Sequence, residues 1–89
     1  MIFKDAENKQ CLKVGKTLAQ SQNKLNKIGV ETTAAYCADR TDRYYMQVCG
    51  SGTPHIHVFE ISESDLEQAK QAGFSALGTI PIHQADCHL

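Results

Sequence analysis

The sequence predicts a small α+β domain in which two helices pack on one face of an antiparallel sheet. Apolar residues recur at spacings of three and four before Gly29, which is typical of an amphipathic helix, and the residues around Ser62 match the start of a second helix. Residues 43–49 and 55–61 form two apolar, β-branched or aromatic runs joined by a Gly/Pro segment, which is the pattern of a β-hairpin. We therefore expect the order α-β-β-β-α-β, with a three-stranded antiparallel meander plus a short edge strand.

The first helix is expected to follow Asp5, which suits the N-cap position, and to end at Gly29. Gly15 lies within this segment and lowers helix stability by about 1 kcal/mol relative to alanine, so a kink or a later start at Thr17 is the alternative. The positions that recur at helical spacing form one seam, made of Cys11, Val14, Leu18, Ser21, Leu25 and Ile28.

Residues 30–38 are expected to form the first strand, which a turn at residues 39–42 connects to the hairpin. Pairing Val48 with Ile56, and Met46 with Val58, would place these four apolar side chains on the core face. The other face would then carry aromatic and imidazole side chains and would lack a covering element. This predicted binding face consists of Tyr36, Tyr45, His57 and Phe59.

Ser62 is expected to cap the second helix, with Ile61 and Leu66 forming a hydrophobic staple across its start. Gly73 should end this helix, with Phe74 folding back onto Ala69. Residues 76–82 follow as a short strand, which Pro81 restricts to a sheet edge because proline cannot donate a backbone hydrogen bond.

A chain of 89 residues is too short for a second domain, so we expect a single domain over residues 1–89, with 82–89 as a tail. No apolar run approaches the ~20 residues of a membrane span, so no membrane partner is expected. A start at Met1 without an apolar signal region predicts a cytoplasmic protein. A periplasmic or secreted location is the expectation if Met1 replaces a removed signal peptide.

The four cysteines do not follow a C-x-x-C spacing, so neither a zinc ribbon nor a thioredoxin-like motif is expected. An even number of cysteines in a short chain is also typical of disulfide-linked secreted domains. From the expected faces of helix and sheet, an oxidised protein should pair Cys11 with Cys37, and Cys49 with Cys87.

His55 and His57 are two residues apart on one strand, so both imidazoles should share a face. This arrangement raises the alternative of a zinc site, because Cys49 is expected opposite His55 and the C-terminal residues offer further ligands. The candidate ligands are Cys49, His55, His57, His83, Cys87 and His88. No other cofactor is expected.

Charge is unevenly distributed although the net charge is only −1. Residues 1–28 contain six lysines and two acidic residues, whereas residues 60–89 contain five acidic residues and one lysine. This distribution suggests two hypotheses. Either the two helices complement one another in charge, or the first helix presents a basic surface to an acidic partner.

The segment GTPHIHVFEIS and the order of elements resemble the strand region of double-stranded-RNA-binding domains. That resemblance implies a lysine-rich start to the second helix for contacting phosphates. The matching positions here are Ser62, Glu63, Ser64 and Asp65, which would repel RNA. Nucleic acid is therefore not the expected partner, and a small RNA-binding or ribonuclease-like domain is only an alternative.

Catalytic signatures are incomplete in this sequence. Cys49 and His55 suggest a nucleophile and base, but nothing identifies an orienting third group or an oxyanion hole. Enzymatic activity is left open and is not favoured. The sequence predicts a small non-enzymatic binding domain that engages a protein partner, or a second copy of itself as a homo-oligomer, through the predicted binding face.

Overall fold

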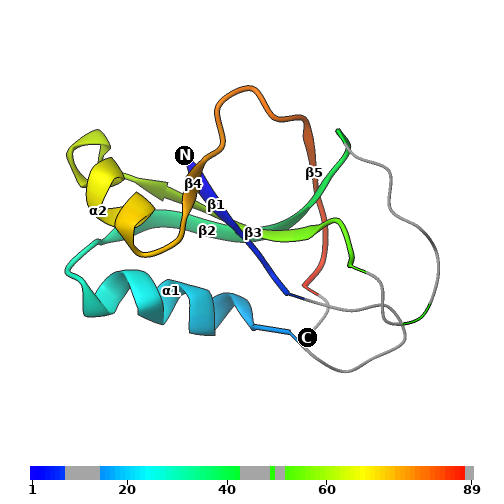
Figure 1. Cartoon of the computed structure of the whole chain (residues 1–89), viewed down its shortest axis with the longest axis horizontal. Coiled ribbons are helices and arrows are strands. Elements are labelled where there is room, and N and C mark those ends of the chain that lie inside the picture. Colours follow the sequence, from blue (N-terminus) through cyan, green and yellow to red (C-terminus); the bar gives the residue numbers. More distant parts are fainter. Residues whose placement is uncertain (8–14, 43–48, 50–51, 88–89) are drawn as a thin grey trace.

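The computed structural model describes residues 1–7, 15–42, 49 and 52–87, and it confirms the α+β class (Figure 1). All the strands belong to one antiparallel sheet with the order β4-β1-β3-β2-β5. The elements, in chain order, are β1 (Ile2–Asp5), α1 (Leu18–Lys27), β2 (Thr32–Arg40), β3 (His55–Ile61), the 3-10 turn η1 (Glu63–Asp65), α2 (Leu66–Gln71), β4 (Ser75–Ala76) and β5 (Ile82–Gln84).

Strand β3 lies at the centre of the sheet and is paired on both edges. Ile56 lies opposite Asp5 of β1 on one side and Ala38 of β2 on the other. Val58 likewise lies between Phe3 and Tyr36. The expected pairing of β3 with residues 46 and 48 is therefore wrong, because β1 and β2 occupy both of its edges. Residues 43–48 lie outside the described part of the chain.

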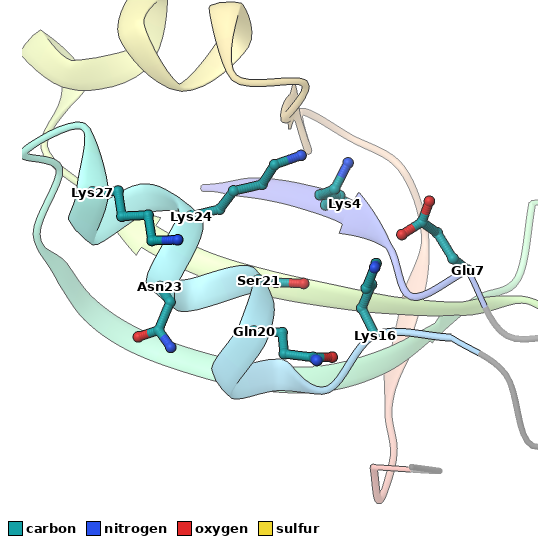
Figure 2. Close-up of a pocket in the computed structure, with 8 residues that line it drawn as sticks. All are labelled: Lys4, Glu7, Lys16, Gln20, Ser21, Asn23, Lys24 and Lys27. Atoms are coloured by element: carbon teal, nitrogen blue, oxygen red, sulfur yellow. The ribbon is translucent and has the colours of Figure 1, made fainter.

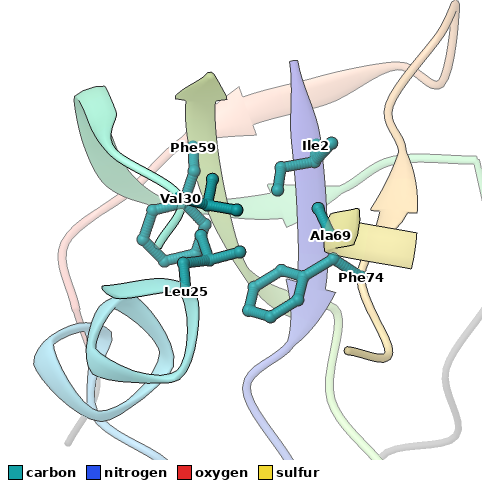
Figure 3. Packing of buried hydrophobic residues seen from close by; sticks show 6 residues of the cluster. All are labelled: Ile2, Leu25, Val30, Phe59, Ala69 and Phe74. Carbon is teal, nitrogen blue, oxygen red and sulfur yellow. The ribbon is translucent and has the colours of Figure 1, made fainter. Parts of the chain in front are cut away.

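One face of the sheet packs against both helices, as expected. Its core is made of apolar side chains from β1, β3, both helices and the segments that follow the helices (Figure 3). Phe59 is 0% exposed and meets Phe74 edge to face, with ring centroids 5.8 Å apart. This cluster consists of Ile2, Leu25, Val30, Phe59, Ala69 and Phe74.

The opposite face has a core of its own, which includes Ile56 and Val58. The connection between β4 and β5 covers this face with Leu77 and the partly buried Ile80 (Figure 1). The sequence correctly placed Ile56 and Val58 on one apolar face, but that face packs against this connection and not against the helices.

Helix α1 begins later than Asp5, at the alternative start that Gly15 suggested. Thr17 is the N-cap: its hydroxyl accepts from the Gln20 backbone N–H at 3.1 Å, and the Gln20 side chain accepts from the Thr17 N–H at 2.8 Å. Gly29, with φ of +81°, ends the helix as predicted. Asp5 instead belongs to β1, a strand that the sequence analysis did not identify.

The second helix is shorter than expected, because a 3-10 turn precedes it and Ser62 makes no side-chain capping hydrogen bond. Ile61 and Leu66 both pack against the helix-side core, as the staple predicted. The helix ends as expected at Gly73: the Gly73 N–H donates to the Lys70 carbonyl at 3.0 Å and the Phe74 N–H to the Ala69 carbonyl at 3.1 Å.

The strand predicted over residues 76–82 is split between the two edges of the sheet. Ser75 and Ala76 form β4 beside β1, whereas residues 82–84 form β5 beside β2. Pro81 lies between them, outside both strands. Part of the segment expected to be a tail is therefore a sheet strand.

We predict that Phe59→Ala lowers the free energy of unfolding by about 3–5 kcal/mol, because it empties a fully buried site between sheet and helices. Chemical denaturation of the oxidised protein measures this change. The neighbouring and exposed Glu60→Ala is the control and should change stability by no more than about 0.5 kcal/mol. A loss below about 1 kcal/mol for Phe59→Ala would indicate that its ring lies on a solvent-facing surface.

The capping contacts give a second comparison. Thr17→Ala should lower the free energy of unfolding by about 1 kcal/mol, because it removes the hydroxyl that accepts from Gln20. Ser62→Ala should have little effect, because Ser62 makes no capping bond. Equal losses in the two variants would contradict the assigned helix starts.

Candidate functional site

A groove runs between β1 and α1 and has a volume of about 340 Å³. Figure 2 shows Lys4 from β1 and Lys24 from α1 extending over it, with the Ser21 hydroxyl between the two elements. We call it the lysine groove, and its lining residues are Lys4, Glu7, Lys16, Gln20, Ser21, Asn23, Lys24 and Lys27.

The four lysines of the groove carry positive charge that the described residues do not neutralise through ion pairs. The close contacts between basic and acidic side chains found within residues 1–7, 15–42, 49 and 52–87 are Arg40–Asp42 and His55–Asp39. Within the described residues, the acidic side chains of η1 and α2 thus form no ion pair with the groove lysines. The described residues therefore do not support the hypothesis that the two helices attract one another through opposite charges. Lys4 also lies over the Phe74 ring, with Nζ 5.7 Å from its centroid.

A buried polar pair lies next to the lysine groove, which Ser21 lines and His57 does not. The Ser21 hydroxyl lies 2.7 Å from Nδ1 of His57, and these residues are only 2% and 3% exposed. The pair joins the buried side of α1 to the central strand. A hydrogen bond is required here, because an unpaired polar group in this position would lower stability by about 1–3 kcal/mol.

Burial lowers the pKa of His57 below its usual value of 6.5, and the negative charge of Asp5 opposes this effect only in part. His57 is therefore neutral at pH 7. A serine hydroxyl in contact with a neutral imidazole resembles the nucleophile and base of some hydrolases. Here both residues are almost fully buried, and the groove beside Ser21 is lined by four lysines, so it is suited to binding anions.

The predicted binding face is not a single exposed surface. Phe59 and His57 are buried on the helix side of the sheet, whereas Tyr36 lies opposite Val58 and packs against the core of the other face. These positions follow from the register of β3, which is paired with β1 on one edge and β2 on the other. Tyr45 lies outside the described residues.

The candidate metal ligands are also not gathered into one site. Nδ1 of His57 contacts Ser21, and Nδ1 of His55 lies 2.6 Å from the Asp39 carboxylate. His83 is exposed on β5, Cys49 and Cys87 are in disulfides, and His88 lies outside the described residues. Within the described ranges, no three His, Cys, Asp or Glu side chains are arranged to hold a metal ion.

The cysteine pairing differs from the expected one. Cys37 forms a disulfide with Cys87, with the Cα atoms 5.3 Å apart, which excludes both predicted pairs. The β5 strand explains this result: it runs beside β2, and the Ala85 N–H donates to the Cys37 carbonyl, so the C-terminal segment lies next to Cys37. Cys49 is also disulfide-bonded, and Cys11 lies outside the described residues.

The sequence contained partial signals for the lysine groove. The excess of lysine in residues 1–28 indicated a basic surface, and Ser21 was a polar residue within the apolar seam of the first helix. A polar residue in that position suggests a buried hydrogen-bond partner. What the sequence did not reveal was β1, which brings Lys4 alongside α1.

Searches against protein-family models, curated proteins and solved structures found no match. In the part of the chain that the structure describes, no helix has the length and apolar character needed to cross a membrane. The assignment of function therefore depends on the lysine groove itself.

The lowered pKa of His57 predicts how stability depends on pH. Below about pH 6.5 the unfolded chain binds a proton at this residue while the folded protein does not, so the free energy of unfolding falls as the pH decreases toward the folded pKa. Chemical denaturation measured between about pH 7.5 and 5.5 should show this decrease in the free energy of unfolding.

His57→Gln should flatten the pH dependence of the free energy of unfolding, whereas the exposed His83→Gln should preserve it. An equal slope in wild type and His57→Gln would contradict the assignment.

Proposed function

We propose that this protein is a small non-enzymatic binding domain whose lysine groove engages an acidic segment of a protein partner. The observation that carries this proposal is the set of four lysines around one groove, none of which is in an ion pair within the described residues. Lysines held side by side repel one another, and a negatively charged ligand would relieve that repulsion.

The shape and lining of the groove favour a short ligand. Gln20 and Asn23 add amide groups that donate and accept hydrogen bonds, which suits a peptide backbone as well as carboxylates. The groove lies on one side of α1, and Glu31 and Glu60 are exposed elsewhere on the surface. A short acidic segment in the groove would meet one acidic residue, Glu7, among four lysines, whereas a long polyanion such as RNA would extend beyond the groove toward further acidic residues.

The disulfides bear on where such binding takes place. Disulfides persist in oxidising surroundings and are rare in the reducing cytosol. The Cys37–Cys87 bond therefore favours a periplasmic or extracellular partner within this proposal.

We expect Lys24→Glu/Lys27→Glu to weaken the binding of an oligo-glutamate peptide about tenfold or more, because attraction becomes repulsion at two exposed positions. Isothermal calorimetry or fluorescence anisotropy at low ionic strength measures the affinity. Wild-type binding should weaken as salt is added.

Lys70→Glu is the control for either single change, Lys24→Glu or Lys27→Glu, because Lys70 also lies in the last turn of a helix but is not part of the lysine groove. This variant should bind the peptide as the wild type does. Equal weakening in Lys70→Glu and in the single groove variant would show that net charge, and not the groove, determines binding. Tighter binding of an RNA oligonucleotide than of the peptide would favour the nucleic-acid alternative.

A further inference from the structure

The lysine groove is in direct contact with a histidine that does not itself line it. Ser21 contributes its side chain to the groove, and its hydroxyl reaches His57 at 2.7 Å. Lys4, another lining residue, lies directly opposite His57 in the register between β1 and β3. The imidazole is thus connected to the groove through one residue of α1 and one of β1.

The charged and titratable groups around His57 come from each neighbouring element. Strand β1 contributes Lys4 and Asp5, whose charge acts on the imidazole. From β2 the opposite residue is Cys37, which does not titrate because it is in a disulfide. The facing residue of α1 is the neutral Ser21. Along β3 itself, His55 lies two residues away, with its Nδ1 2.6 Å from the Asp39 carboxylate. The remaining lysines of the groove are Lys16, Lys24 and Lys27.

Burial keeps His57 neutral in the free protein by disfavouring its charged form, and the negative charge of Asp5 offsets this effect only in part. A bound anion would add a second negative charge near the imidazole, and this charge attracts a proton to the nearest group able to accept one. The lysines cannot play this role, since they already carry their protons at neutral pH.

We propose that binding of an anionic ligand in the lysine groove is coupled to proton uptake by His57, so that the affinity for the ligand rises as the pH falls. The Ser21 hydroxyl suits this coupling, because it donates to a neutral Nδ1 and accepts from a protonated one, keeping the hydrogen bond in both states. By linkage, protonation tightens binding by the same factor by which the ligand favours protonation. The inference rests on the proposed anion-binding function of the groove.

The experiment uses a polyvinylsulfonate oligomer as the probe, because its charge does not change over the pH range in question. NMR titration of the His57 ring, in the whole oxidised protein, gives its pKa with and without saturating probe. We expect the pKa to be higher in the bound state. The affinity for the probe should be roughly three- to fivefold tighter at about pH 5.5 than at about pH 7.5.

Variants separate His57 from the other histidines. His83→Gln, at an exposed position on β5, should retain the full pH dependence of affinity. His57→Gln should bind the probe at about pH 7.5 as the wild type does but lose the gain at lower pH. If this variant does not fold, the NMR titration of His57 in the wild-type protein tests the coupling by itself.

The outcomes distinguish this inference from the function on which it rests. An unchanged His57 pKa in the probe-saturated protein, or a pH dependence that persists in His57→Gln, would overturn the coupling while leaving the binding function intact. Absence of probe binding at both pH values would contradict the binding function and the coupling together.

Discussion

The pairing of β3 on both edges is the constraint on which the rest of the structure depends. With β1 on one side and β2 on the other, β3 is the central strand, and its alternating residues must fill two different cores. Phe59 and His57 therefore face the helices, while Ile56 and Val58 face the β4–β5 connection. The short strand β1 thereby determines which side chains of β3 point to each face of the sheet.

The same pairing creates the lysine groove. β1 brings Lys4 alongside α1, and the packing of Leu25 in the helix-side core fixes the rotation of α1 that turns Ser21 toward His57. The exposed residues of that helix then place their lysines around the groove. Binding chemistry thus follows from core packing, since the residues that hold α1 on the sheet also set the position of its charges.

Local interactions were predictable from the sequence, and long-range pairing was not. The helix ends at Gly29 and Gly73 were found because glycine in a left-handed conformation acts within one turn. Alternation along β3 identified which residues share a face, but it cannot say which face meets the helices, because that depends on the neighbouring strand. β1 has four residues, too few for a recognisable pattern, so Lys4 was not placed beside the helix. The sequence showed the basic character of residues 1–28, but it did not show that some of these lysines line a groove.

Chemical-shift mapping by NMR tests the central claim most directly, namely that ligand binding takes place between β1 and α1. The isotope-labelled protein would be titrated with an oligo-glutamate peptide while its backbone amide signals are followed. We predict that the largest changes occur at Lys4, Ser21 and Lys24, which come from both sides of the lysine groove. Changes concentrated on β5 and the β4–β5 connection, with the groove residues unaffected, would contradict the account.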